Sequence, residues 1–164
     1  VSESLDYEGE LAIYIGKPGR HIAQDDAMDH IAGYSCFNDA SVRDWQRHTS
    51  QFTPGKNFAS TGASGPWLVT ADDIKDPFNL GLVTRVNGTE LQRTNTSLMI
   101  HSIQKLISYI SEFTPLHPGD VIVSGTCGGV GNARKPPIFL KPGDTVEVEI
   151  SEIGTLVNSV VDEE

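Results

Sequence analysis

Basic residues are scarce in this 164-residue sequence, which has 12 lysines and arginines against 22 aspartates and glutamates. The formal net charge is −10 at pH 7 with histidine neutral. Nucleic acids and anionic membrane surfaces are bound by patches of positive charge, so this balance argues against both as partners. A small anionic substrate stays compatible with the charge, because a bound cation can reverse the local field of an acidic site.

Cysteine is almost absent as well. Cys36 and Cys127 are the only two, and their positions fit neither a disulfide framework nor a zinc site. The five histidines also lack metal-ligand spacing. The sequence contains no secretory signal and no apolar run long enough to span a bilayer. It therefore predicts one domain over residues 1–164, in the reducing environment of the cytoplasm.

Strand signals dominate what the sequence does contain. An apolar, β-rich run covers residues 11–15, and regular alternation marks residues 145–150. Asn87-Gly88 lies between two further β-rich runs and predicts a tight hairpin. Apolar residues at helical spacing predict one amphipathic helix over residues 98–110, whereas residues 50–65 look like a long polar loop. Few helices and no strand–helix–strand series favour an α+β fold.

Three acidic residues suggest a metal site. Glu8 and Glu10 are two apart, so in a strand their side chains point to the same face and can meet Asp39 after folding. Oxygen ligands without Cys or His favour a hard divalent ion such as Mg²⁺, Mn²⁺ or Ca²⁺. The alternative is that Glu8 and Glu10 are only the solvent face of an edge strand.

Polar and cationic residues that could act on a substrate follow Asp39. Arg43 and Gln46 are three apart, so one helical turn would place both on one face. Together with Lys56 they could stabilise negative charge that develops on a carbonyl oxygen. Lys56 by itself could equally be a solvated surface lysine in its loop.

A glycine-rich segment, residues 125–131, follows a predicted strand. Its glycines allow the backbone to approach a ligand, but it lacks the ending of a nucleotide-binding phosphate loop. We interpret Thr126, next to Gly125, as a hydroxyl for a substrate carboxylate; a plain glycine turn is the alternative. Cys127 has no histidine placed to activate it and is expected to be an inert thiol.

Four ordered blocks of the sequence resemble the fumarylacetoacetate hydrolase family. They are LDYEGELA at 5–12, NDASVRDWQ at 38–46, GKNF at 55–58, and PGDVI with SGT at 118–126. The resemblance implies a mixed β-sandwich roll, usually a homodimer. It also implies Mg²⁺ or Mn²⁺ bound by Glu8, Glu10 and Asp39. Beside that ion it implies an oxyanion site formed by Arg43, Gln46 and Lys56. It also implies a site for the substrate carboxylate, formed by Thr126 with Gly125.

The resemblance also sets the expected reaction. It implies a metal-dependent hydrolase that cleaves a C–C bond in a small 2-oxo or β-diketo acid of the acylpyruvate type, through a metal-stabilised enolate. An isomerase or decarboxylase of a 2-oxo dicarboxylate could use the same site. Family members carry an N-terminal segment, in several with a His-Glu pair that activates water, and this chain is expected to lack it. A noncatalytic metal-binding fragment is therefore the third alternative.

Overall fold

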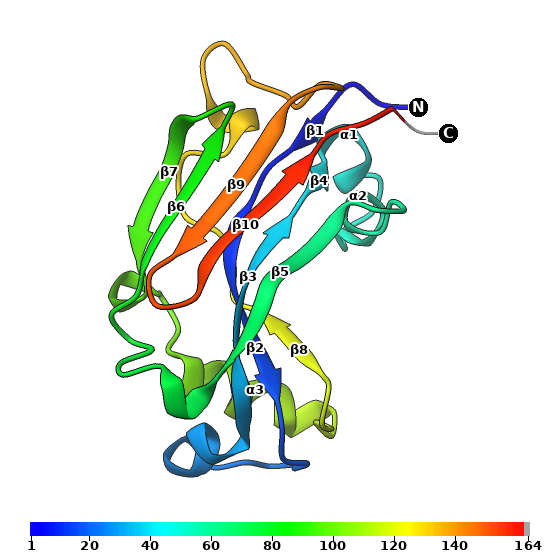
Figure 1. Cartoon of the computed structure of the whole chain (residues 1–164). Helices are drawn as coiled ribbons and strands as arrows, with labels where there is room; N and C mark the ends of the chain where they lie inside the picture. Colours follow the sequence, from blue (N-terminus) through cyan, green and yellow to red (C-terminus); the bar gives the residue numbers. More distant parts are fainter. Residues whose placement is uncertain (163–164) are drawn as a thin grey trace.

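Strands form most of the regular structure in the computed structural model, which describes residues 1–162 (Figure 1). The strands are β1 (Leu5–Asp6), β2 (Gly9–Ile15), β3 (Ile31–Asp39), β4 (Ser41–Val42), β5 (Gly62–Thr70), β6 (Gly81–Val86), β7 (Thr89–Asn95), β8 (Val121–Val123), β9 (Thr145–Ile150) and β10 (Gly154–Ser159). The α-helices are α1 (Arg43–Gln46), α2 (Thr53–Lys56) and α3 (Ile103–Phe113). The 3-10 turns are η1 (Gln24–His30), η2 (Ala71–Asp73), η3 (Thr96–Leu98) and η4 (Gly131–Ala133). The expected α+β class with few short helices is confirmed.

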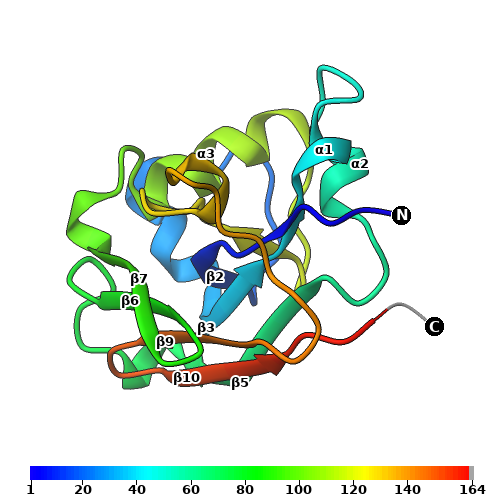
Figure 2. The ribbon, with the colours of Figure 1, turned by 90° about the horizontal axis from the view of Figure 1, so that it is seen from above.

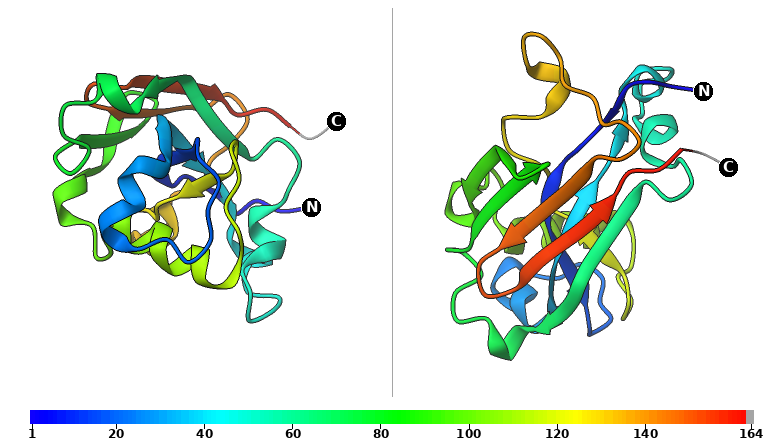
Figure 3. Two further views of the ribbon diagram at one scale, coloured as in Figure 1. Left: turned by 90° about the horizontal axis from the view of Figure 1, so that it is seen from below. Right: turned by 45° about the horizontal axis from the view of Figure 1, so that its top comes forward.

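Two four-stranded sheets share the main hydrophobic core. Their strand orders are β5-β3-β2-β8 and β10-β9-β6-β7, and β1 pairs separately with β4. All pairings among the described strands are antiparallel. The core joins buried side chains of both sheets, such as Ile13 of β2 and Val148 of β9. Figures 2 and 3 show the layers from above and below, with α3 on one side of β2 and β3 and with β9 and β10 on the other.

The predicted hairpin is confirmed as β6 and β7. Asn87 and Gly88 both have positive φ, at 50° and 75°, as a type I′ turn requires. The Asn87 side chain also donates to Asp144 and accepts from the backbone N–H of Thr145, so the turn is tied to the start of β9. The hairpin thereby extends the second sheet to four strands.

The long amphipathic helix begins later than the sequence predicts. Helix α3 starts at Ile103, because the Ser102 hydroxyl accepts a hydrogen bond from the Lys105 N–H and caps the helix there. Leu98 and Ile100 are 72% and 94% exposed and do not belong to the buried stripe. No helix in the described part of the chain is long and apolar enough to cross a membrane.

The expected loop over residues 50–65 is shorter than predicted. It contains α2, and β5 already begins at Gly62. Helix α2 packs against α1 and β4, and the Trp45 and Phe58 rings meet edge to face with centroids 5.3 Å apart. This packing brings Lys56, the last residue of α2, back to the end of β3. The fold therefore places the cationic residues beside the predicted acidic cluster.

Candidate metal centre

The three predicted metal ligands converge. Glu10 lies in β2, Asp39 ends β3, and Glu8 directly precedes β2. The pairing of Gly9 with Asn38 and the hydrogen bond from the Asp39 N–H to the Glu8 carbonyl (2.9 Å) place these residues side by side. One carboxylate oxygen from each lies within 4.8 Å of the others. Three anions this close repel one another unless cations lie among them.

Gly9 separates the two glutamates for a steric reason. It faces β6 of the other sheet, and a Cβ atom on residue 9 would lie 2.0 Å from the Thr84 hydroxyl oxygen. No side chain fits there without moving the sheets apart. The close approach of the sheets at Gly9 therefore fixes where Glu8 and Glu10 stand.

Lys56 joins two of the three carboxylates. Its Nζ lies 2.8 Å from Glu8 Oε2 and 2.6 Å from Asp39 Oδ2. Burial by itself lowers the pKa of Lys56, but hydrogen bonds to Asp39 and Glu8 and their charges leave the pKa raised. Lys56 therefore stays protonated at the site, and the alternative of a freely solvated lysine is wrong.

Arg43 contacts the same cluster from α1. Its Nη1 lies 2.7 Å from Glu8 Oε1 and donates to Gln46 Oε1 at 3.1 Å, while its Nε donates to Asp6 Oδ2 at 2.8 Å. Its Nη2 is buried and has no hydrogen-bond partner. Burial tends to lower the pKa of Arg43, and the bonds to Asp6 and Glu8 raise it overall. One nitrogen of this guanidinium therefore keeps both of its hydrogens without a partner in the described chain.

The glycine-rich segment borders Glu10. The Gly125 N–H donates to Glu10 Oε2 at 2.5 Å, and the Thr126 hydroxyl donates to the Gly9 carbonyl at 3.0 Å. Gln92 of β7 donates to the Thr126 oxygen at 2.8 Å and accepts from the Gly9 N–H at 3.0 Å. The segment is thus fixed to β2, and a simple glycine turn does not describe it.

Glu10 is the carboxylate with the most perturbed acidity. Burial raises its pKa from 4.5 to about 8, the Gly125 N–H opposes this, and the charges of Asp39 and Glu8 add to it. Near neutral pH, Glu10 therefore binds a proton when no metal ion is present. A metal ion at the cluster would have to displace that proton.

The residues present fit a hard divalent cation. With Asp6, Glu8, Glu10 and Asp39 ionised and Arg43 and Lys56 protonated, these side chains carry two excess negative charges. One divalent ion would neutralise them, and all three converging ligands offer oxygen.

Sequence reasoning missed two residues of this network, Asp6 and Gln92. Asp6 had a signal, since Asp6, Glu8 and Glu10 are successive residues of one period-two pattern, although Asp6 turns out to bind Arg43. Gln92 had none, because one polar residue in a strand gives no indication that it is 1% exposed and hydrogen-bonded on both sides.

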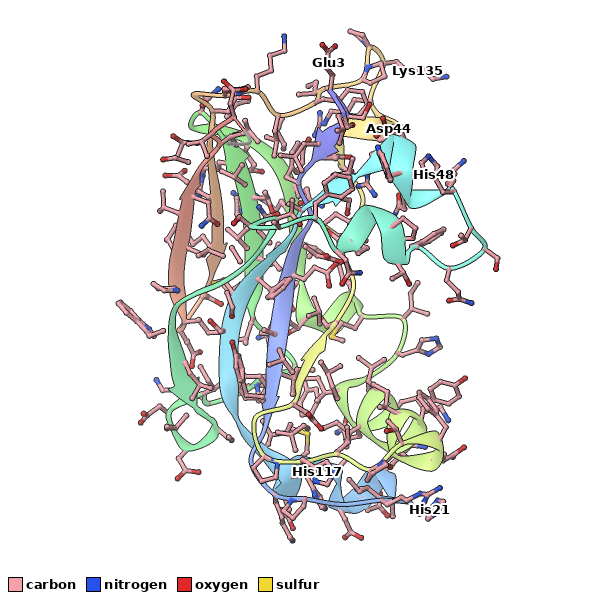
Figure 4. The ribbon with its side chains drawn as sticks, turned by 90° about the vertical axis from the view of Figure 1, so that its right-hand side faces the viewer. Glu3, His21, Asp44, His48, His117 and Lys135 are labelled. Carbon is pink, nitrogen blue, oxygen red and sulfur yellow. The ribbon has the colours of Figure 1, made fainter. Side chains whose placement is uncertain are left out.

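Histidines make no hydrogen bond or ion pair to the three carboxylates within residues 1–162. Figure 4 shows His21 and His117 at the end of the molecule opposite α1, and His48 on the outer side of that helix. The described chemistry of the site therefore rests on carboxylates, one lysine, one arginine and amide groups.

Known proteins share both the sequence and this fold. The family described as fumarylacetoacetate (FAA) hydrolase C-terminal matches residues 1–161. The chain is 48% identical over 162 residues to oxaloacetate tautomerase FAHD2A, mitochondrial, of Bos taurus. This alignment covers 98% of this chain and 52% of the relative. The chain thus spans about half the length of that curated relative.

Solved structures agree with the sequence match. A fumarylacetoacetate hydrolase from Exiguobacterium antarcticum superposes with a TM-score of 0.96 at 41% identity, covering 99% of this chain and 58% of that one. A maleylpyruvate hydrolase from Sphingobium sp. SYK-6, in complex with manganese(II) and pyruvate, superposes with a TM-score of 0.86 at 33% identity. The match covers 98% of this chain and 56% of that one. The predicted β-sandwich roll of the C-terminal domain type is confirmed. The chain belongs to the fumarylacetoacetate hydrolase family.

Proposed function

We propose that the site catalyses keto–enol tautomerisation of a small 2-oxo dicarboxylate such as oxaloacetate. The observation that carries the proposal is the arrangement of Lys56 and Arg43 against three converging carboxylates. Tautomerisation moves one proton between C3 and the 2-oxo oxygen, so it needs stabilised negative charge on that oxygen and a group that transfers the proton, but it consumes no water. The tautomerase name of the bovine relative supports the same reaction class.

Glu8, Glu10 and Asp39 would hold Mg²⁺ or Mn²⁺, with Ca²⁺ as a further hard-ion candidate. Such an ion would act as a Lewis acid: it would withdraw electron density from the 2-oxo group and make the adjacent C–H more acidic. The manganese(II) in the maleylpyruvate hydrolase complex supports this assignment.

Lys56, Arg43 and Gln46 would act on the substrate oxygen. Lys56 keeps its proton and places positive charge beside Glu8 and Asp39. Arg43 offers the unpaired N–H groups of Nη2, and Gln46 fixes Nη1. Their charges favour the state in which the 2-oxo oxygen becomes negative.

Thr126 and Gly125 would border the substrate carboxylate. The Gly125 N–H is already bonded to Glu10, and the single Thr126 hydroxyl proton is directed at the Gly9 carbonyl. Thr126 can therefore donate to a substrate only by giving up that bond. A comparison of Thr126→Ser, which keeps the hydroxyl, with Thr126→Val, which removes it, tests this role.

Hydrolysis of an acylpyruvate-type C–C bond is the second candidate, and the maleylpyruvate hydrolase of the same fold favours it. It needs a base that activates water, and no residue among 1–162 is assigned that role. Decarboxylation of the same substrate would need no such base. The bovine relative is named mitochondrial, so the predicted cytoplasmic location stays a prediction.

The test follows three products from the metal-loaded protein. Loss of enol absorbance in oxaloacetate without release of pyruvate identifies tautomerisation, and pyruvate with carbon dioxide identifies decarboxylation. Pyruvate with a second acid from an acylpyruvate identifies hydrolysis. A rate equal to that of buffer with every substrate would leave only the noncatalytic metal-binding fragment.

A further inference from the structure

Asp6 is a fully buried carboxylate outside the three-carboxylate cluster. It is 0% exposed. Its Oδ1 accepts from the N–H groups of Tyr7 and Gly131, and its Oδ2 accepts from the Asn132 N–H and Arg43 Nε, all at 2.8 to 2.9 Å. A carboxylate has about four lone-pair sites. All of them are used, so Asp6 has no capacity left for a metal ion or a substrate.

Its contact with Arg43 is unusual in one respect. A guanidinium commonly meets a carboxylate with two parallel N–H bonds. Here Asp6 binds Nε alone, because its other positions are taken by backbone N–H groups. Nη1 is directed at Glu8 and Gln46, and Nη2 remains buried without a partner. The arrangement fixes the plane of the guanidinium and leaves both Nη2 hydrogens unassigned.

We propose that Asp6 is a positioning residue, which acts through Arg43 by holding its guanidinium so that Nη2 stays available to an oxygen of the substrate. The inference rests on the proposed function, because it deepens the role given there to Arg43. Asp6 makes no hydrogen bond to the three-carboxylate cluster, and its acceptor positions are all used by Tyr7, Gly131, Asn132 and Arg43. Its effect on the reaction therefore has to pass through Arg43.

Asp6 has a second structural connection that must be separated from this role. It also holds Gly131 and Asn132, and a Cβ on residue 131 would lie 1.8 Å from the Ile138 carbonyl and 2.7 Å from Asp6 Oδ1. Removing Asp6 could thus disturb this loop. Arg134 supplies a matched control, because it fixes the same loop through Tyr7, Gly129 and Leu91.

The experiment is a double-mutant cycle with oxalate as the probe, a stable planar dianion that resembles a 2-oxo acid. Calorimetry measures oxalate affinity of the manganese-loaded wild type, Asp6→Asn, Arg43→Met and the double variant. Asp6→Asn should weaken oxalate binding about tenfold or more, as expected for a misplaced charged donor. In the Arg43→Met background it should have no further effect.

The proposal would be overturned if Asp6→Asn weakened oxalate binding equally in the wild-type and Arg43→Met backgrounds. It would also be overturned if Arg134→Met weakened oxalate binding as much as Asp6→Asn does. If Asp6→Asn does not fold, Arg43→Lys decides the question with Asp6 intact. It keeps the charge but lacks Nε and the fork, so it should bind oxalate nearly as weakly as Arg43→Met. Wild-type affinity in Arg43→Lys would show that positioning by Asp6 is unnecessary. Because oxalate binding requires no turnover, a failure of this proposal can be distinguished from a failure of the proposed tautomerase activity.

Discussion

Lys56 is the residue whose positive charge lies closest to the acidic cluster. Its removal should lower kcat by roughly 10²-fold with a modest change in KM, because the charge acts where an oxygen becomes negative in the transition state. Lys56→Met tested by steady-state kinetics measures this. Lys105→Met, an exposed lysine on α3, is the matched control and should leave kcat unchanged. An unchanged kcat in Lys56→Met would remove Lys56 from the reaction.

Glu10 makes stability depend on pH. Its pKa is 4.5 as a free side chain and about 8 in the metal-free fold. Between these values the folded state binds more protons than the unfolded state, so stability decreases as pH rises through this window and levels off above it. Urea unfolding without metal should show the decrease, and saturating Mn²⁺ or the Glu10→Gln substitution should abolish it. A flat profile for the metal-free wild type contradicts the raised pKa.

Several site residues could be predicted from the sequence, because their relative positions depend on the geometry of a single strand or helical turn. Glu8 and Glu10 follow the two-residue period of a strand, and Arg43 and Gln46 follow a helical turn, so short-range geometry already places them together. Asp6 shares the same period but was not assigned a role. Its function depends on Gly131 and Asn132, 125 and 126 residues away, and no local pattern encodes such contacts.

The β6–β7 hairpin connects the second sheet to the site through Gln92. Gln92→Leu should destabilise the fold by about 2–3 kcal/mol, because the Gly9 N–H and the Cys127 carbonyl lose a buried partner. Urea unfolding measures the loss. Thr84→Val on β6 is the matched control, since the buried Thr84 hydroxyl oxygen has no partner. Equal stability of Gln92→Leu and Thr84→Val would show that the Gln92 bonds contribute nothing.

Helices and strands were predicted well where the turn residues are specific to one turn type, and less well where a helix cap determines the boundary. Asn87-Gly88 identifies the hairpin because few other residues adopt positive φ at both positions. The start of α3 was placed too early, because the apolar spacing of Leu98 and Met99 continues that of the helix. The cap at Ser102 and the separate turn η3 outweigh that spacing.

At the scale of the whole molecule, the family resemblance predicts a homodimer. Trp67 on β5 and Val157 on β10 are 62% and 55% exposed, and these two strands pack side by side. Sedimentation at micromolar concentration should give twice the mass of one chain. Trp67→Arg should shift the equilibrium toward monomer if this face is the contact. An active monomer with metal present would show that the predicted assembly does not apply.

We expect Glu8, Glu10 and Asp39 together to bind one divalent ion. Calorimetric titration of Mn²⁺ into the wild type, Asp39→Ala and the control Asp25→Asn, an exposed acid in η1, tests it directly. One site per chain is expected in the wild type and in Asp25→Asn, and Asp39→Ala should lose it because one of the three oxygen ligands is removed and the excess negative charge of the surrounding side chains falls from two to one. Equal affinity in Asp39→Ala and the wild type would contradict the claim.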